Sequence, residues 1–345
     1  MRILIDINHP AHVHYFRNFI RLMEERGHQF CVVNRDSKMI NQLLDYYGIV
    51  HTIRNKRPAK KGTMASLWNL AKMTGWCMRK SADFHPDLYI GFASSACALS
   101  SWMFGKPCIL IDDTEHNATN HRMYLPFCDK VLTPFYFYKQ LGNGSKQERF
   151  QAYVEQLYLH SSYYSNGKTV LSELKINPQE YVIFRFIAYD AHHDLVAHPL
   201  PEDTKKELVK LAAKRFRVFV SLEKDNQDSF YDSYKLDISP EKMHDLMANA
   251  RCLVTEGATM ASEAYVLGVP YLYLNPLRCG NIDYQCEHSP QRAFQTTIGE
   301  DAKTIINNLL SVCIDYDEER RILEQKTINP TKYLIELVEK EIKRQ

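Results

Sequence analysis

Short apolar runs alternate with amphipathic stretches along this chain of 345 residues. Ile3–Ile7 is such a run, apolar positions at helical spacing follow from Val13 to Met23, and Phe30–Val33 forms the next run. A short, continuous apolar run is typical of a strand buried on both faces of a parallel sheet. The opening of the chain therefore predicts a βαβ unit, with Gly27 ending its helix and a right-handed crossover.

The same alternation continues to about residue 133. Further strands are predicted at Asp87–Gly91, Pro107–Ile111 and Lys130–Thr133, with a helix of small residues at Ser94–Phe104. Residues 140–168 are rich in Gly, Asn, Ser and Tyr and have no clean periodicity. Such a stretch favours loops, so we expect the chain to pass between domains near residues 160–170.

A second α/β series follows. Its predicted strands are Tyr181–Phe186, Phe216–Val220, Cys252–Val254 and Pro270–Leu274, and its predicted helices are Glu202–Lys214, Glu241–Ala250 and Thr259–Leu267, with a last helix after Pro330. The chain is thus predicted to be an α/β protein with domains at 1–165 and 166–325 and a C-terminal helix at 326–345 that packs back on the first domain. Two such sheets favour a ligand site between them, the alternative being two domains without a shared site.

Composition narrows the class of protein. Apolar residues make up 45% and charged residues 24%, and the formal net charge is +2, which excludes a uniformly basic polyanion binder. No apolar run is long enough for a membrane span, and the first residues lack the pattern of a signal peptide. The nine cysteines never occur as C-x-x-C, which favours reduced thiols in a cytoplasmic protein.

The strongest local signal for a ligand follows the strand that ends at Val254. Glu256 and Gly257 lead into a helix near Thr259, and Ala258 and Met260 belong to the same turn. We expect Gly257 to allow a tight turn, and the exposed amides of the first helical turn to hold a diphosphate without a metal. The carboxylate of Glu263, further along the helix, could accept both hydroxyls of a ribose. The alternative is a plain strand-to-helix turn.

Three histidines lie in a predicted polar loop after the first strand, which Pro10 interrupts. They are His9, His12 and His14, and His12 lies where the following helix starts. Imidazole titrates near neutral pH, so a histidine here could take a proton from an attacking hydroxyl. Zinc binding and plain loop capping are the alternatives, but no cysteine or pair of carboxylates accompanies the histidines at ligand spacing, so no metal site is expected.

Polar side chains also follow the strand that ends at Ile111. Asp113, Glu115, His116 and Asn117 offer acid, imidazole and amide groups at the carboxyl end of this strand. Together they could hydrogen-bond a sugar. The alternative is capping of a helix by Asp113 or by the neighbouring threonine.

In the second series, Arg185 interrupts an apolar strand, and Asp190 and His193 follow it. An unpaired arginine is costly to bury, so we expect Arg185 to face the ligand site. An ion pair between Arg185 and Asp190 is the alternative.

Residues 51–82 contain eight Lys or Arg and no Asp or Glu, with Trp68 and Trp76 at near-helical spacing. This combination suits an anionic membrane surface or a polyprenyl-phosphate acceptor, and a solvated charged face is the alternative. No nucleic-acid-binding motif is present, so no nucleic-acid partner is expected.

The turn at residues 257–263, followed by Leu267-Gly268-Val269-Pro270, resembles the donor-binding signature of GT-B glycosyltransferases, in particular the N-acetylglucosaminyltransferase that makes lipid II. The non-hydrolysing UDP-N-acetylglucosamine 2-epimerases share that fold and a similar turn. The resemblance implies two Rossmann-like domains, with the UDP diphosphate on residues 257–260 and the ribose on Glu263.

Other matches concern the first domain. Ala11-His12-Val13 is similar to the Gly-Gly-His loop of the lipid II enzyme, which makes His12 the candidate base, and residues 115–117 resemble its Glu-Gln-Asn motif on the acceptor side. The chain as a whole resembles a prokaryotic GT-B-like family, a domain of unknown function grouped with those two enzymes. It departs from the pattern at Pro10-Ala11, at the stretch after Arg185, and in lacking the epimerases' N-terminal Gly-Thr-Arg-Pro-Glu.

The leading hypothesis is an inverting, metal-independent glycosyltransferase that uses a nucleotide sugar, UDP-linked, to build a cell-surface polysaccharide or a lipid-linked glycan. The nucleotide sugar is a substrate, and no cofactor is expected. His12 and Glu115 are the candidate catalytic residues. The acceptor side would comprise His9, His14, Asp113, His116 and Asn117, and the donor side Arg185, Asp190, His193, Glu256, Gly257, Ala258, Thr259, Met260 and Glu263. A UDP-N-acetylhexosamine 2-epimerase and a non-catalytic binding protein are the alternatives.

Overall fold

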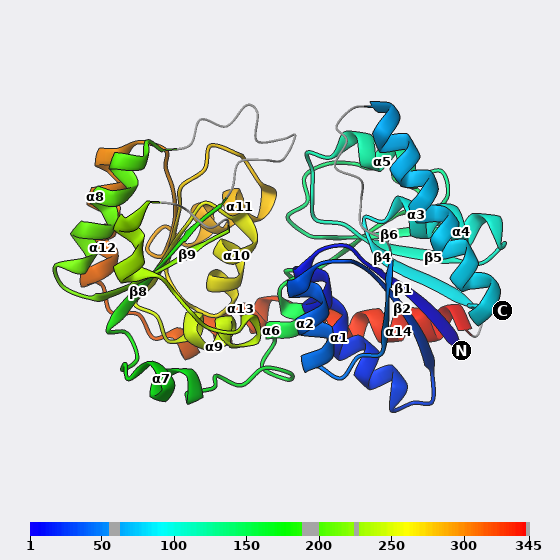
Figure 1. Ribbon diagram of the computed structural model, residues 1–345, viewed down its shortest axis with the longest axis horizontal. Helices are drawn as coiled ribbons and strands as arrows, with labels where there is room; N and C mark the ends of the chain where they lie inside the picture. Colours follow the sequence, from blue (N-terminus) through cyan, green and yellow to red (C-terminus); the bar gives the residue numbers. More distant parts are fainter. Residues whose placement is uncertain (55–62, 188–199, 224–227, 343–345) are drawn as a thin grey trace. The chain divides into compact units, whose positions relative to one another are not determined.

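The computed structural model describes residues 1–54, 63–187, 200–223 and 228–342, except for the side chains of 63–67 and 342. The chain forms two compact units (Figure 1). The first comprises Met1–Tyr158 together with Thr327–Gln345, and the second comprises Leu159–Lys326. The chain therefore leaves the first unit once and returns to it for its final helix.

The first unit is built on a seven-stranded sheet in the order β3-β2-β1-β4-β5-β6-β7, and every pair of neighbouring strands is parallel. The strands are β1 (Arg2–Ile7), β2 (Gln29–Arg35), β3 (His51–Arg54), β4 (Leu88–Phe92), β5 (Cys108–Ile111), β6 (Lys130–Pro134) and β7 (Gln147–Phe150). The central strands β1, β4 and β5 are almost entirely buried, as their continuous apolar runs predict.

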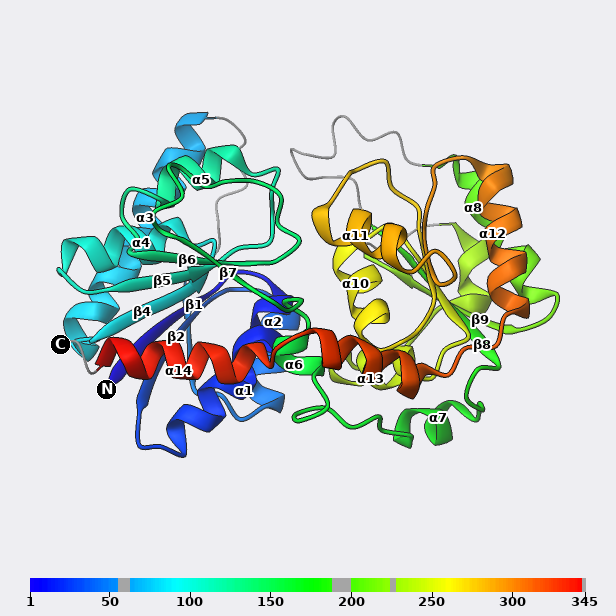
Figure 2. The ribbon, with the colours of Figure 1, turned by 180° about the vertical axis from the view of Figure 1, so that it is seen from behind.

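Helices cover both faces of this sheet (Figures 1 and 2). The helices are α1 (Pro10–Glu24), α2 (Lys38–Tyr46), α3 (Thr63–Phe84), α4 (Ser95–Met103), α5 (Ala118–Tyr124) and α14 (Pro330–Ile342), with the short α6 (Gln156–Leu159) where the chain leaves the unit. On one face α1 packs against α2 and α14, and on the other face α4 packs against α3 and α5.

Helix α1 begins earlier than the sequence suggested. Pro10 occupies its first turn and His9 caps it, so the expected polar loop is only a few residues long. Proline suits the first turn of a helix because the N–H that it lacks would have no partner there. His12 and His14 therefore belong to the helix itself, which corrects their placement in a loop.

The stretch expected to be irregular, residues 140–168, contributes to the first unit. Residues 147–150 form β7, which pairs in parallel with β6 at the edge of the sheet. Its sequence, Gln-Glu-Arg-Phe, lacks an apolar run because an edge strand exposes much of its surface.

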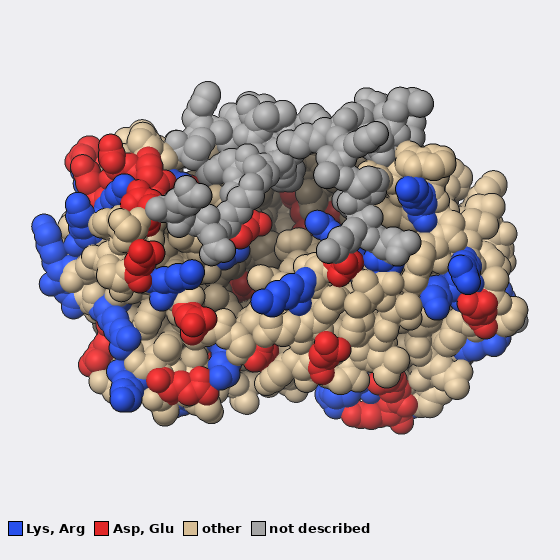
Figure 3. Space-filling model, in the orientation of Figure 1, with Lys and Arg blue, Asp and Glu red and all other residues tan. Residues whose placement is uncertain are grey.

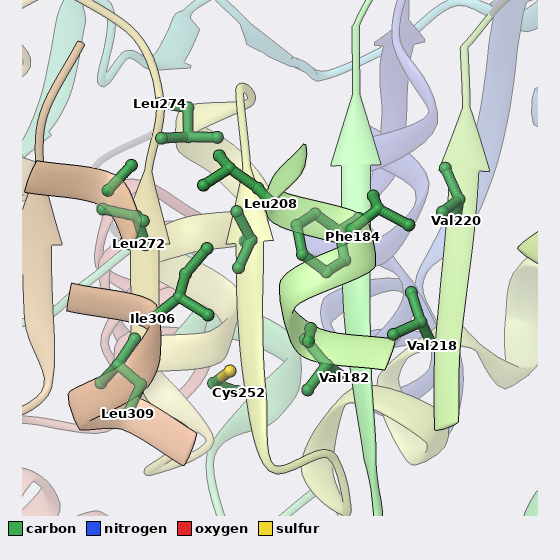
Figure 4. Packing of buried hydrophobic residues seen from close by; sticks show 14 of the residues in the cluster. Val182, Phe184, Leu208, Val218, Val220, Cys252, Leu272, Leu274, Ile306 and Leu309 are labelled. Carbon is green, nitrogen blue, oxygen red and sulfur yellow. The ribbon is translucent and has the colours of Figure 1, made fainter. Parts of the chain in front are cut away.

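The second unit has a five-stranded parallel sheet in the order β12-β11-β10-β8-β9. Its elements are α7 (Thr169–Leu174), β8 (Tyr181–Phe186), α8 (Glu202–Ala213), β9 (Arg217–Leu222), η2 (Ser229–Tyr234), η3 (Pro240–Lys242), α9 (Met243–Ala248), β10 (Cys252–Thr255), α10 (Ala258–Val266), β11 (Tyr271–Tyr273), α11 (Gly280–His288), β12 (Ala293–Gln295), α12 (Gly299–Ser311) and α13 (Tyr316–Lys326). The core between the sheet and helices α8 and α12 contains Phe184, Leu208 and Ile306 (Figure 4).

Each sheet has a point at which the order of strands reverses. In the first sheet it lies between β1 and β4, and in the second between β8 and β10. Parallel sheets of this kind bind ligands at the carboxyl ends of the strands at such a reversal. The two carboxyl edges are therefore where functional residues are expected.

On the face of the molecule seen in Figure 3, Lys and Arg alternate with Asp and Glu instead of forming a large patch of one sign. This mixture agrees with the small net charge of +2. Within the described part of the chain, no helix is both long and apolar enough to cross a membrane.

Candidate functional site

A buried ion-pair network lies at the carboxyl end of β1. Asp6 is fully buried, and its Oδ1 lies 3.0 Å from Nη1 of Arg54 at the end of β3. The side-chain amide of Asn8 donates to Asp6 Oδ2 at 2.7 Å and accepts from Arg54, and the hydroxyl of Ser94 also donates to Asp6. A buried charge needs such compensation, so we assign Asp6 a structural role. We call Asp6, Asn8, Arg54 and Ser94 the β1-end network.

His12 lies directly beside this network. The backbone N–H of Asn8 donates to Nδ1 of His12 at 3.3 Å, and the imidazole ring packs against Phe92 with their centroids 4.8 Å apart. Burial lowers the pKa of His12 well below its usual 6.5, and the nearby His9 and Arg54 lower it further. The imidazole is therefore neutral at neutral pH.

The other two histidines of the N-terminal segment differ in surroundings. His9 is exposed, and its Nδ1 caps α1 by accepting from the N–H of Ala11 at 3.2 Å. His14 is buried and stacks on Tyr158 with centroids 5.3 Å apart, while Nη1 of Arg17 lies 3.3 Å from its Nδ1. The structure thus brings His9 next to His12 and places His14 in an aromatic contact.

The turn between β4 and α4 completes the switch point of the first sheet. Ala93 has φ +44°, a left-handed conformation that is uncommon for a residue with a side chain. Ser94 follows and caps α4, because its hydroxyl accepts from the N–H of Cys97 at 3.2 Å. Ser94 therefore ties the start of α4 to Asp6 at the end of β1. Neither Ser94 nor Arg54 was predicted as a site residue, because their partners lie far away along the chain.

Two adjacent carboxylates after β5 have different surroundings. Asp112 is fully buried and accepts from the N–H of Thr114 at 2.8 Å and the hydroxyl of Tyr124 at 2.6 Å, and Nε2 of His121 lies 3.2 Å away. Asp113 accepts from the hydroxyl of Thr114 at 3.0 Å. Burial, together with the charge of Asp112, raises the pKa of Asp113 to about 7. Asp113 can therefore exchange a proton near neutral pH.

Residues from the next two strand ends lie near Asp113. Burial raises the pKa of Tyr136, which follows β6, and the charges of Glu155 and Asp113 raise it further. Glu155 follows β7 and is buried. The carboxyl edge thus brings together acids that lie more than 40 residues apart in sequence. Neither Tyr136 nor Glu155 was predicted as a site residue, because neither belongs to a local cluster of polar residues.

The remaining candidates of the first unit divide by exposure. Glu115 is buried, and its backbone carbonyl accepts from Nζ of Lys139 at 3.0 Å. His116 and Asn117 are exposed. Asn117, instead of Asp113 or Thr114, caps helix α5 by accepting from the N–H of Asn120 at 3.2 Å.

In the second unit, helix α10 begins at the switch point between β8 and β10. Gly257 precedes it with φ −100° and ψ 122°, a conformation open to any residue, so the turn does not depend on a backbone conformation that only glycine adopts. The N–H groups of Ala258, Thr259 and Met260 have no acceptor within the helix because they lie in its first turn. All three residues are partly exposed, so this turn presents the positive end of a helix.

Glu256 supports this turn from within the protein. It is fully buried, and its two carboxylate oxygens contact Nζ of Lys205 at 2.6 Å and the N–H of Ile187 at 3.0 Å. Its backbone carbonyl accepts from the side chain of Asn275 at 3.0 Å. Glu256 therefore links α8, β8 and β10 at the edge of the sheet.

Glu263 lies on the face of α10 that packs against α9. It is 5% exposed, and its Oε1 lies 3.0 Å from Nε2 of His244. Arg185, at the end of β8, is half-buried and donates to the hydroxyl of Ser221 at 2.8 Å. Burial lowers the pKa of Arg185, and the charges of Glu223 and Glu263 oppose that effect. Asp190 and His193 lie outside the described residues, as does the proposed Arg185–Asp190 pair.

No group of three or more His, Cys, Asp or Glu with metal-binding geometry occurs among the residues that the structure describes. The cysteines of the chain are free thiols.

The chain matches a described protein family over almost its whole length. A family model described as "Protein of unknown function (DUF354)" matches residues 1–343. An uncharacterized protein of Methanocaldococcus jannaschii is 22% identical over an alignment of 306 residues, and the match covers 81% of this chain and 83% of that protein.

Two solved structures illustrate the likeness in fold. The UDP-GlcNAc 2-epimerase of Neisseria meningitidis, solved with UDP-GlcNAc bound, superimposes with a TM-score of 0.65 at 13% identity and covers 99% of this chain and 100% of its own. MurG of Acinetobacter baumannii superimposes with a TM-score of 0.58 at 15% identity over 99% and 100% of the two chains. The predicted GT-B-like fold of two Rossmann-like units is confirmed, as is the predicted kinship with a GT-B-like domain of unknown function.

Proposed function

This chain belongs to the protein family of unknown function DUF354, and we propose that it is an inverting, metal-independent glycosyltransferase that takes a sugar from a UDP-linked nucleotide sugar. The acceptor would be a growing polysaccharide or a lipid-linked glycan of the cell envelope. In the reaction an acceptor hydroxyl attacks the anomeric carbon, the bond from that carbon to the diphosphate breaks, and UDP leaves while a base takes the hydroxyl proton. No cofactor takes part.

The observation that best supports this proposal is the start of α10 at the switch point of the second sheet. Three successive N–H groups at Ala258–Met260, with the dipole of a nine-residue helix behind them, form a place for a diphosphate. Glu263 would bind the ribose, and Arg185 would assist with the phosphates. Glu256, Gly257, Asp190 and His193 complete the proposed donor side.

The acceptor side would be the carboxyl edge of the first sheet. His12 and Glu115 are the proposed catalytic residues, because both are buried beside the ends of strands at which ligands bind in this type of sheet. The side chains proposed to contact the acceptor are His9, His14, Asp113, His116 and Asn117.

Helix α3 supports a contact with an anionic membrane at the inner face of the cell envelope. Nζ of Lys72 lies 5.5 Å from the ring centroid of Trp68, and Nζ of Lys80 lies 5.4 Å from that of Trp76. Trp68 is 63% exposed, and paired aromatic and cationic side chains suit the headgroup region. Co-sedimentation with vesicles of anionic phospholipid tests this contact, and equal binding to neutral vesicles would contradict it.

A thermal-shift screen against UDP, GDP, CDP, dTDP and their sugars, with and without EDTA, tests the proposal. A ligand that binds only the native state adds about 2.7 kcal/mol when its concentration is 100 times its Kd. We expect a shift with UDP and a UDP-sugar that EDTA does not change. No shift with any nucleotide would overturn the nucleotide-sugar assignment.

A UDP-N-acetylhexosamine 2-epimerase is the second candidate. It is favoured by the likeness to the Neisseria meningitidis epimerase along the whole length of both chains. An epimerase converts UDP-GlcNAc without an acceptor, so an NMR time course of UDP-GlcNAc with the protein alone separates the two activities. Binding without any turnover would instead indicate a non-catalytic nucleotide-sugar-binding protein.

A further inference from the structure

The β1-end network holds the side chain of Asn8 by polar contacts to two other residues. The side-chain amide of Asn8 lies between two buried charges, donating to Asp6 and accepting from Arg54, while Asp6 and Arg54 also contact each other at 3.0 Å. Three residues from β1, the turn after it and β3 thus form a closed ring of polar contacts. Such a ring leaves the Asn8 side chain little freedom, and the backbone N–H of Asn8 is held with it.

That N–H points at the imidazole of His12. Because Nδ1 of His12 accepts a hydrogen bond from the N–H of Asn8 at 3.3 Å, Nδ1 cannot carry a proton of its own in this arrangement. A neutral imidazole must then carry its proton on Nε2. A cationic imidazole would place two N–H groups against each other and would lose the bond to Asn8.

The surroundings of the ring favour the neutral form. The ring of His12 contacts Phe92 from β4 and Tyr15 from α1, with centroid separations of 4.8 and 6.0 Å. Among the described residues, His9, which caps the helix, and Arg54 at the end of β3 act on the ring electrostatically, and both disfavour a further positive charge. The nearby carboxylate of Asp6 is held by Arg54.

We infer that His12 acts as a neutral hydrogen-bond donor through Nε2–H, directed at an oxygen of the substrate, and that Asp6, Asn8 and Arg54 are positioning residues that keep this tautomer. The inference rests on the proposed function, in which His12 meets the substrate, and it changes the role of His12 within it. A general base at Nε2 would need a proton on Nδ1, where Asn8 presents a donor. The preorganised Nε2–H instead stabilises negative charge on a substrate oxygen.

The proton of the attacking hydroxyl then goes to a carboxylate at the same edge of the sheet. Asp113 and Glu115 both follow β5, which lies two strands along from β1 in the sheet. In this scheme His12 loses and gains no proton during the reaction. The base accepts the hydroxyl proton while the new bond to the anomeric carbon forms.

Nuclear magnetic resonance of the protein labelled with ¹⁵N-histidine tests the tautomer directly and needs no substrate. Long-range ¹H–¹⁵N correlations distinguish Nδ1–H, Nε2–H and the cation. Loss of one signal in His12→Gln identifies His12 among the 14 histidines. We expect the neutral Nε2–H form at neutral pH and also at pH values below 6.5, the usual pKa of histidine, because the pKa of His12 is lowered. A proton on Nδ1, or a cation at neutral pH, would overturn the inference.

Arg54→Lys and Asn8→Ala test the positioning residues in the same spectra, with Arg122→Lys as a matched control because Arg122 is an exposed arginine of the same unit. We expect the first two variants to mix the tautomers of His12 and the control to leave them unchanged. If the Nε2–H tautomer is unchanged in both Arg54→Lys and Asn8→Ala, Arg54 and Asn8 are not positioning residues.

The rate at which the protein turns over the UDP-linked sugar supplies the second measurement. A glutamine amide can donate a hydrogen bond near the position of Nε2 but cannot take up a proton, so His12→Gln is expected to keep at least about tenfold more kcat/KM than His12→Ala. Equal loss in the two variants would contradict the donor role. If the wild-type protein binds no nucleotide sugar while the Nε2–H tautomer is observed, the proposed function fails and the tautomer assignment stands.

Discussion

Three aspartates at the carboxyl edge of the first sheet differ in their hydrogen-bond and ion-pair partners. Asp6 is balanced by Arg54, and Asp112 accepts from a backbone N–H and a tyrosine hydroxyl. Asp113 accepts from the hydroxyl of Thr114 and lies beside the charge of Asp112. The polar contacts of the first two are made within the protein, and the raised pKa of Asp113 makes it the member of this group that is suited to exchange a proton with a ligand.

Replacing Asp113 is expected to change how stability depends on pH. Its pKa is raised from 3.8 to about 7 in the folded state, so the folded protein holds this proton more tightly and loses stability as the pH rises through that interval. Asp113→Asn cannot ionise and is expected to be more stable than the wild type above neutral pH by about 2 kcal/mol, allowing for solvent screening. The difference should vanish in acid below the ordinary pKa of aspartate.

Urea unfolding at a series of pH values measures this effect. Asp45→Asn is the matched control, because the side chain of Asp45 is 74% exposed. A constant difference between Asp113→Asn and the wild type across the whole pH range would contradict a raised pKa.

The sequence indicates which strand ends carry polar groups but not how those groups pair. Asp6 and Arg54 meet because β1 and β3 are both bonded to β2, a relation that depends on the register of the sheet. His244 meets Glu263 through the packing of α9 on α10. Neither pair has a local sequence signal, because each is created only when the strands and helices assemble.

Helices α1 and α10 both follow a strand at the switch point of their sheets, but the start of α10 was predicted more accurately than that of α1. The apolar runs identified β1 and β10, since such strands are buried on both faces. The start of α1 was predicted too late because Pro10 was interpreted as a loop residue. The strands β3 and β7 were missed because His-Thr-Ile-Arg and Gln-Glu-Arg-Phe lie at or near the sheet edges and lack a continuous apolar run.

The N-terminus of α10 provides a test in which stability and binding change in opposite directions. A Cβ added at Gly257 would make only ordinary contacts with Ile187 and Thr255, at 3.6 and 3.7 Å. Aspartate is a better N-cap than glycine, so Gly257→Asp is expected to stabilise the protein by a few tenths of a kcal/mol, about 0.5 kcal/mol. The added carboxylate would lie at the proposed diphosphate site and would repel the diphosphate of UDP. The thermal shift with UDP should therefore be lost.

Gly257→Ser is the matched control, because serine also caps a helix but carries no charge. We expect it to keep more of the UDP-induced shift than Gly257→Asp does. An undiminished UDP shift in Gly257→Asp would place the diphosphate elsewhere.

The first unit is not a continuous segment of the chain. Helix α14 packs against α1, the helix that carries His12 (Figure 2). Leu334, Ile335 and Val338 of α14 are buried, and the hydroxyl of Thr331 donates to the backbone carbonyl of Leu157 at 2.7 Å. The last helix therefore belongs to the core that supports the proposed acceptor side.

Shortening a buried side chain of α14 is expected to weaken the first unit selectively. Leu334 is 1% exposed, and truncation of a buried leucine to alanine costs about 2 to 5 kcal/mol. Leu334→Ala should thus increase hydrogen exchange in α1 and β1 while leaving β8 and β10 of the second unit protected. Lys332→Ala, whose side chain is 73% exposed, is the control on the same helix. Equal deprotection of both units would contradict the expectation that the first unit can be weakened without the second.

The return of the chain to the first unit sets an order of events during protein synthesis. The ribosome must add the whole of Leu159–Lys326 before the residues of α14 exist. At the usual rate of chain elongation this interval lasts about 10 to 30 s. Throughout that time the surface of α1 that α14 later covers is exposed on the nascent chain, so this face of the first unit is the one on which a chaperone that binds apolar segments would act.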